Sequence, residues 1–294
     1  MSIQLESVER INALKSGIEA VTGESYEDLT AGVQALKNGY GQGGESELLL
    51  GEVTDFSGFF QSGRRMEVFN KIDTKNATNM YQFCYQNSQI TEPPIINTSN
   101  VISMEETFKE CTNMKLPPNS GKDKDGNIIP LDTKNVESFR YTFRACRNME
   151  GEIYLDTQSA TSLYQTFSAC QKITKITFTD TGKSNDWFAT FNACSALKTI
   201  ENLTMNTTSS NTFVGCTSLE NVTFIKVAIP AQNNVPILNI TQLSRDSIYS
   251  LVNALKPNTG DVITIALGNC LSKLSSDEKN EVKNIATSKG FNLT

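Results

Sequence analysis

The sequence predicts an α/β-type repeat solenoid with one short parallel strand per coil, preceded by N-terminal helices and followed by a small C-terminal α/β cap. Three observations support this prediction. The motif Thr-Phe-x-x-Cys occurs five times, its copies are mostly 22 to 24 residues apart, and the two ends of the chain have a helical periodicity that the middle lacks. A fixed period of about 20 to 29 residues is typical of solenoids, in which each repeat contacts its neighbours.

The motif copies align on their phenylalanines, whose spacings are 35, 24, 24 and 22 residues. Two degenerate copies precede them, at Phe83 with Gln86 in the cysteine position and at Phe60 with Gly63 there. We predict that the motif residues form a stacked structural core, because one coil cannot bury its apolar side alone. These residues are Phe108, Cys111, Phe143, Cys146, Phe167, Cys170, Phe191, Cys194, Phe213 and Cys216.

Each residue type in the motif has a physical role in this prediction. Free cysteine is a small and strongly buried side chain, which suits the corner of a coil. The threonine hydroxyl can bond to nearby backbone and finish a turn. The stretches that follow the cysteines alternate and are rich in β-branched residues, which favours strands at 172–178, 197–205 and 219–224.

The repeats TSNVISMEETFKECTNMK (98–115) and SLYQTFSACQKITKITF (162–178) resemble BspA-like leucine-rich repeats. That family also combines Asn- and Thr-rich coils with a Phe-x-x-Cys signature, and the resemblance extends over roughly residues 50 to 228. It implies a curved parallel-β solenoid that serves binding or adhesion rather than catalysis.

Residues 1–44 form a separate N-terminal segment. Apolar residues spaced by three and four within 3–37 predict helices, and NGYGQGG (38–44) is a linker sequence. A short helical pair cannot build much core alone, so we expect it to dock on another part of the assembly. Capping of its own solenoid is the alternative. The segment also resembles, more weakly, short helical leaders of phage tail and baseplate proteins.

Residues 45–235 are predicted to form the solenoid and residues 236–294 a C-terminal capping module. In this module we expect a helix at 244–255, a strand at 261–267 and a helix at 275–288 that ends at Gly290. The sequence TQLSRDSIYSLVNALKP and the ending IATSKGF resemble the C-terminal module of repeat proteins found among tail genes of phages of Gram-positive bacteria.

The composition excludes several classes of function. The 294 residues carry a net charge of −6 and no histidine, so a Ser-His-Asp triad, a Cys-His pair and a mixed Cys/His zinc site are impossible. No basic patch indicates a nucleic-acid partner, and no apolar run is long enough to span a membrane. Seven cysteines in a chain without an apolar secretory leader predict free thiols in a cytoplasm. We expect no enzyme activity, no cofactor and no metal.

An insertion at 117–132 accounts for the one long spacing between repeats. Its DKDGN sequence (123–127) is similar to a calcium loop, but the glycine is fourth instead of sixth and Lys134 replaces the final glutamate. Insertions in solenoids often lie on a binding face. We therefore regard this loop as a candidate contact site, with the residues Lys122, Asp123, Asp125 and Asn127.

Together these features predict a non-catalytic structural and binding protein of a virion, in a phage tail, baseplate or related injection particle. Residues 1–44 would contact other virion proteins or bring copies together as a homo-oligomer, and the solenoid would bind a host-surface glycan or protein. The main alternative is a BspA-like adhesin at the bacterial cell surface. A glycan-cleaving tail enzyme with two carboxylates in one groove and a head decoration protein are lesser alternatives.

Overall fold

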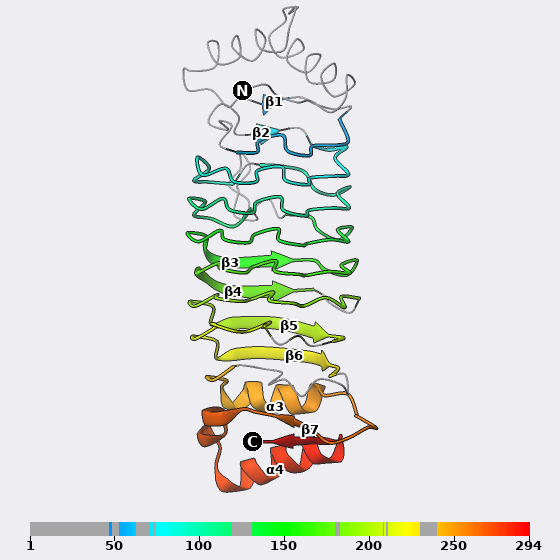
Figure 1. Ribbon diagram of the computed structural model, residues 1–294, viewed down its shortest axis with the longest axis vertical. Helices are drawn as coiled ribbons and strands as arrows, with labels where there is room; N and C mark the ends of the chain where they lie inside the picture. Colours follow the sequence, from blue (N-terminus) through cyan, green and yellow to red (C-terminus); the bar gives the residue numbers. More distant parts are fainter. Residues whose placement is uncertain are drawn as a thin grey trace, which may run out of the picture.

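The computed structural model shows an elongated solenoid whose coils stack along the long axis, with a C-terminal module at one end (Figure 1). The predicted N-terminal helices lie outside the residues that the structure describes. The described residues are 47–48, 53–62, 71–72, 74–93, 95–118, 131–179, 183–207, 209, 211–229 and 240–294.

Parallel strands run along one side of the coils. A short pair is formed by β1 (Glu47–Leu48) and β2 (Lys71–Ile72). A four-stranded sheet has the order β3-β4-β5-β6. Its strands are β3 (Glu150–Leu155), β4 (Lys172–Phe178), β5 (Thr199–Met205) and β6 (Asn221–Val227). The fold class is thus confirmed, and β4 has the bounds that its sequence predicts.

The register of the sheet stacks like residues on one another. Ile176 of β4 pairs with Ile153 of β3 and with Ile200 of β5, which in turn pairs with Val222 of β6. All four side chains are buried. A second parallel ladder, made of single bridges on the other side of the coil, links Asp55, Asn79, Ser103, Ser138, Ser162 and Asp186 in that order.

The phenylalanines of the motif form a continuous stack in the core. The rings of Phe108 and Phe143 have centroids 5.7 Å apart and are inclined by 3°, and the stack continues through Phe167, Phe191 and Phe213 at 5.4 to 6.0 Å. Phe178 of β4 contacts Phe191 from the opposite side of the coil. The motif segments and the strands therefore face each other across one core, and their outer surfaces point away from each other.

The threonine and cysteine of each motif bond to the preceding coil. The hydroxyl of Thr166 donates to the carbonyl of Phe139 at 2.9 Å, and the thiol of Cys170 donates to the carbonyl of Phe143 at 3.0 Å. The same two bonds recur in every copy of the motif. The threonine thus joins coils to one another. In two copies it also bonds within its own coil, as the sequence suggested, because the hydroxyls of Thr190 and Thr212 also donate to the carbonyls of Trp187 and Ser209.

The structure corrects the alignment of the degenerate copy at Phe83. The backbone N–H groups of Cys84 and Phe108 bond to the carbonyls of Thr107 and Thr142, respectively, so Cys84 occupies the phenylalanine position of its coil. Phe83 occupies the threonine position, and Asn87 takes the cysteine position that the sequence alignment gave to Gln86. This shift by one residue explains why the following apolar residue, Ile90, is one place late in the sequence alignment.

Two residues in most motif segments have a left-handed backbone. In the coil of Phe108 these are Glu106 and Glu110, with φ of 58° and 62°, and the same positions recur in other coils. The alternation of right- and left-handed residues points every second N–H toward the next coil. The N–H groups of Met80, Gln82, Cys84 and Gln86, for example, all donate to carbonyls of the following coil.

The C-terminal module covers the open edge of β6. Its elements are α3 (Arg245–Ala254), β7 (Ile263–Ile265), the 3-10 helix η2 (Gly268–Lys273), α4 (Ser276–Ser288) and β8 (Phe291–Leu293). Two serines of α3 replace a further strand: Ser247 and Ser250 accept the N–H groups of Val222 and Phe224, each at 2.8 Å. The edge of the sheet is thereby satisfied by hydroxyl groups on a helix.

Sequence signals set the ends of both helices. Ser244 caps the N-terminus of α3, and Ser275 with Glu278 forms a reciprocal capping box at α4. Gly290, with φ of 82°, follows α4 in the left-handed conformation that favours glycine. β8 then pairs in parallel with β7. The helices and strand predicted for this module are all present.

Candidate recognition surfaces

An aromatic and cationic surface covers the outer side of the motif segments. We call it the aromatic–cation face. Each motif segment has a buried residue near its start, such as Phe139 or Leu163. The face is formed by the residues one, two or five positions after it, and these residues are half-buried. Its members are Tyr85, Lys109, Arg140, Tyr141, Arg144, Tyr164 and Phe188.

Rings and cations alternate along this face. The ammonium group of Lys109 lies 4.9 Å from the ring centroids of both Tyr85 and Tyr141. The guanidinium of Arg140 lies 4.5 Å from the ring of Tyr164, which stacks on Phe188 at 5.2 Å. Cation–π contacts of this kind stabilise by about 0.5–1 kcal/mol at exposed sites. The ring of Tyr164 is thus held between Arg140 and Phe188.

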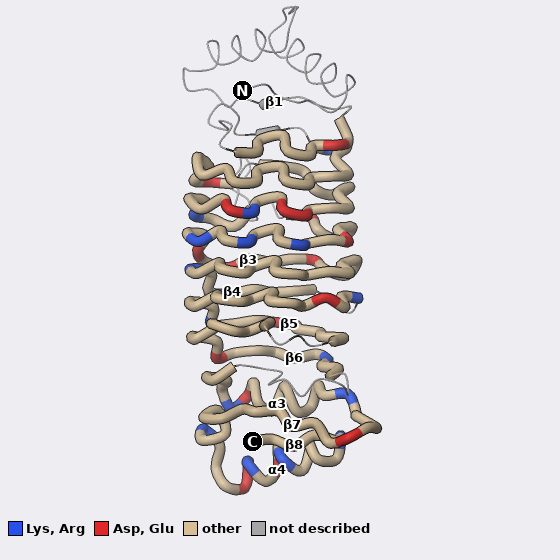
Figure 2. The backbone as a smooth tube through the Cα atoms, in the orientation of Figure 1, with Lys and Arg blue, Asp and Glu red and all other residues tan. Residues whose placement is uncertain are grey.

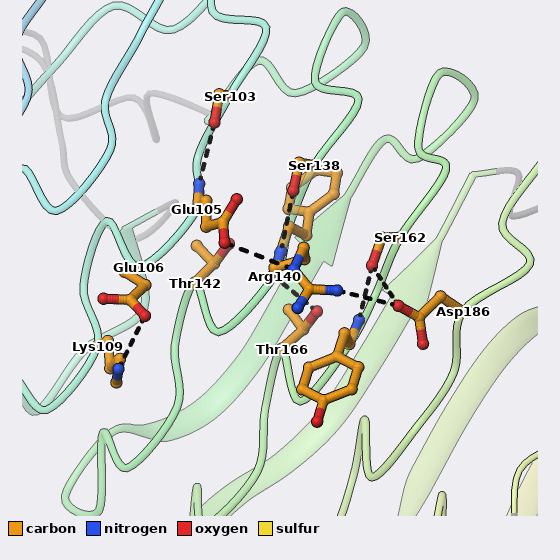
Figure 3. Close-up of polar contacts among 12 residues, drawn as sticks. Ser103, Glu105, Glu106, Lys109, Ser138, Arg140, Thr142, Ser162, Thr166 and Asp186 are labelled. Atoms are coloured by element: carbon orange, nitrogen blue, oxygen red, sulfur yellow. Dashed lines mark hydrogen bonds and ion pairs between the residues drawn. The ribbon is translucent and has the colours of Figure 1, made fainter.

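Acidic side chains hold the cations in place. Arg140 lies between Glu105 at 3.4 Å and Asp186 at 3.2 Å, as Figure 3 shows. Asp186 also accepts the hydroxyl of Ser162 at 3.0 Å. In the same figure Lys109 pairs with Glu106 at 2.9 Å. The two ion pairs of Arg140 connect coils and fix its orientation, although exposed pairs contribute only about 0–1 kcal/mol each to stability.

The local backbone explains why these side chains are held in rows. In coil after coil, the residue directly before this buried residue accepts, through its side chain, the backbone N–H of the residue two positions later. Ser138, for instance, accepts the N–H of Arg140, and Asp186 accepts that of Phe188. Such turns are typical of Ser, Asp and Asn. The Asn- and Ser-rich composition of the repeat thus positions the aromatic–cation face.

Two tyrosines of this side, Tyr81 and Tyr141, are neutral at physiological pH. The pKa of Tyr141 is raised by burial and by its hydrogen bond with Tyr164, and burial also raises the pKa of Tyr81. Their hydroxyls can therefore donate and accept hydrogen bonds, but they do not supply a base. This chemistry suits recognition.

The outer side of the sheet β3–β6 forms a second surface, the strand face. Lys175 lies between Glu201 at 3.0 Å and Glu152 at 3.9 Å, and Thr177 donates to Glu201. The hydrogen bond between Lys175 and Glu201 raises the pKa of the lysine and, as its largest cause, lowers that of the glutamate. Two exposed hydrophobic side chains lie on the outer strands of the same sheet, Tyr154 of β3 and Ile225 of β6, which are 45% and 59% exposed.

The ten motif residues predicted from the sequence all lie in the core, where each is at most 3% exposed. Burial raises the pKa of the thiols, for Cys111 and Cys216 to about 12, so these cysteines are poor nucleophiles. The predicted contact loop with Lys122, Asp123, Asp125 and Asn127 lies outside the described residues. Within the described part of the chain, no cluster of three or more Cys, Asp or Glu residues could hold a metal.

Sequence reasoning missed both surfaces. Their residues vary from coil to coil, so no motif marks them. A signal was nevertheless available, because Arg140, Tyr164 and Phe188 stand at one position of the aligned repeat, directly after a buried residue. Figure 2 shows that acidic and basic segments lie in adjacent coils just before β3.

Comparison with known families supports the repeat assignment. Residues 128–235 match the model described as BspA type leucine rich repeat region (6 copies), and residues 54–173 match that of a Mycoplasma protein of unknown function, DUF285. The repeat region is therefore similar to BspA-like leucine-rich repeats, which are typical of binding or adhesin-like proteins.

No curated protein and no solved structure matches the chain. Neither of the two family descriptions names an enzyme activity. Among the described helices, none combines the length and the apolar character that crossing a bilayer requires.

Proposed function

We propose that this chain is a non-catalytic structural and binding protein of a phage tail or baseplate, or of a related injection particle, assembled in the host cytoplasm. The strand face is the observation that carries the binding function. It holds an ion-paired Glu152–Lys175–Glu201 group together with two exposed hydrophobic side chains, Tyr154 and Ile225. Exposed aromatic and apolar residues around a few oriented polar groups are typical of recognition surfaces.

The target of the strand face is a glycan or protein of the host surface. A parallel sheet held rigid by a continuous core keeps Tyr154 and Ile225 at a constant separation, which lowers the entropic cost of binding. Repeat proteins commonly use such extended surfaces for binding.

The virion setting is supported by the resemblance of residues 241–294 to modules encoded among phage tail genes. In this chain that module covers the last coil, which protects the sheet edge from pairing with other chains. Residues 1–44 then connect the solenoid to other virion proteins.

Binding to host cells tests the recognition function. We expect the purified chain to bind intact cells of its host, and the double variant Tyr154→Ala with Ile225→Ser to lose at least about tenfold in affinity, as expected for two central contacts. Val262→Ser is the matched control, because Val262 is 69% exposed but lies in the C-terminal module. Equal binding by both variants would contradict the assignment to the strand face.

Light scattering tests the anchoring role of residues 1–44. We expect the complex of the chain with a virion partner protein to be lost when the chain starts at Glu45, while thermal unfolding is unchanged. Loss of thermal stability without a change in mass or in partner binding would show that the segment caps the solenoid instead.

A bacterial surface adhesin is the second candidate. It is favoured by the two family matches, one of which is described as a Mycoplasma protein. An antibody against the chain separates the two candidates, because an adhesin labels the surface of intact producing cells, whereas a virion protein is found in purified particles.

A further inference from the structure

We propose that the aromatic–cation face binds a second copy of the chain, face to face and antiparallel. This contact is separate from recognition through the strand face, since the two surfaces lie on opposite sides of the core. The argument rests on the order of the residues along the solenoid axis.

Four consecutive coils contribute rows of different chemistry to this side of the molecule. In chain order they are a tyrosine row, an acidic row, a basic row and a second tyrosine row. The first consists of Tyr81, Gln82, Tyr85 and Gln86, the acidic row of Glu105, Glu106, Lys109 and Glu110, the basic row of Arg140, Tyr141 and Arg144, and the last of Tyr164 and Gln165.

This order is nearly symmetric about a line between the acidic and basic rows. With three glutamates and one lysine, the acidic row has a charge of −2, and the two arginines give the basic row +2. A two-fold axis that runs along that line, in the plane of the interface, places the acidic row of each copy on the basic row of the other. It also places each tyrosine row on the other tyrosine row. Such self-complementarity is what an isologous dimer requires.

The charges of the two central rows are open to a partner. The side chains of Glu105 and Glu110 are each 33% exposed, and those of Arg140 and Arg144 are 36% and 38% exposed. Arg144 reaches Glu110 only at 3.7 Å within its own chain. A guanidinium has five N–H donors, so each arginine can bind a second carboxylate from the other copy.

The aromatic residues favour a protein as the occupant over a sugar. Sugars stack on ring faces, but here Lys109 and Arg140 cover faces of Tyr141 and Tyr164. Exposed ring edges, hydroxyls and guanidinium groups remain. Tyrosine and arginine are the residue types enriched in the energetic centres of protein interfaces.

Sedimentation or light scattering of the full chain as a function of concentration tests this contact. We expect the wild type to self-associate, less strongly at high salt. Glu110→Arg and Arg144→Glu each place like charges opposite one another in the homodimer, so each variant alone should lose at least about tenfold in association constant. An equimolar mixture of the two should recover it. In the mixed dimer the two substituted side chains, which carry opposite charges, face each other, and native Glu110 of one copy faces native Arg144 of the other.

Lys175→Glu on the strand face is the control, and it should associate like the wild type. Circular dichroism of each variant verifies the fold, and recovery in the mixture cannot occur if either variant is unfolded. Association of the Arg144→Glu variant at wild-type strength, a monomeric wild type, or a mixture without recovery would overturn the proposal. None of these results affects binding to cells through Tyr154 and Ile225, so the proposed function fails or stands separately.

Discussion

The side-chain amide of Asn87 donates a hydrogen bond of 2.9 Å to the carbonyl of Phe60, one coil earlier. In the next coil the thiol of Cys111 makes the equivalent bond to the carbonyl of Cys84 at 3.0 Å. Asparagine thus replaces cysteine as the buried donor at this position, and it is fully buried. The position requires a donor toward the preceding coil more than it requires sulfur.

The loss of stability on substitution of Asn87 should therefore depend on whether the new side chain can donate a hydrogen bond. We expect Asn87→Cys to be less destabilising than Asn87→Leu, and the leucine variant to lose about 1–3 kcal/mol because it removes a buried donor. Asn113→Leu is the control, since its amide makes a similar bond to Ser88 in an exposed setting and should cost less than about 0.5 kcal/mol. Denaturant unfolding measures the order, and equal stability of the two Asn87 variants would contradict it.

The cysteines should be unreactive in the native protein. Burial raises the pKa of the core thiols, so the thiolate that attacks a disulfide reagent is nearly absent below pH 9. A colorimetric thiol reagent should find fewer than one reactive thiol per native chain at pH 8, and all seven in denaturant. Rapid labelling of several thiols in the native state would show that the coils open locally.

The glycine after α4 should be essential for its stability. A Cβ atom added to Gly290 would lie 2.6 Å from the carbonyl oxygen of Asn258. The substituted residue would also have to keep a φ of 82°, which is strained for residues with a side chain. Gly151 has a similar φ of 90° but no atom within 4 Å of such a Cβ. We expect Gly290→Ala to cost at least about 1 kcal/mol more than Gly151→Ala, because overpacking against backbone adds to the strain that both share. Thermal unfolding of the two variants provides the comparison.

Glu278 should make the C-terminal module sensitive to acid. Hydrogen bonding to the backbone of Ser275, followed by the bond from Arg245, lowers its pKa from 4.5 to about 2. Because the folded pKa is depressed, its stabilising contribution is complete above about pH 4.5 and is lost as the pH falls toward 2. Glu278→Gln should flatten the pH dependence of unfolding in that window and leave it unchanged at pH 7 to 8. A profile parallel to that of the wild type would refute the assignment.

Much of the fold could be predicted because the core residues recur at a fixed period in the sequence. Phe143, Phe167 and Phe191 lie 24 residues apart, and that period sets both the stack and the parallel strands. The error at Phe83 arose because a phenylalanine stands where other coils have threonine, and only the hydrogen bonds between coils identify the register.

Other features depend on contacts that the repeat does not encode. The sequence predicts Ser247 and Ser250 only as part of a helix at 244–255, yet they bond to the edge of β6. The aromatic–cation face is built from positions that the core leaves free to vary. Arg140 and Tyr164 could be brought together only once the stacking of coils was known.

The one-way hydrogen bonds of the motif segments have an electrostatic consequence. In these segments the peptide units whose N–H groups point to the next coil have carbonyls that point to the preceding one, so their dipoles add along the solenoid axis. An α-helix is positive at its N-terminus, whereas these rows are positive toward the C-terminal module. Four such rows run side by side through the coils of Met80 and Met104, and their combined field favours an anion on the side of the following coils and a cation on the side of the preceding ones.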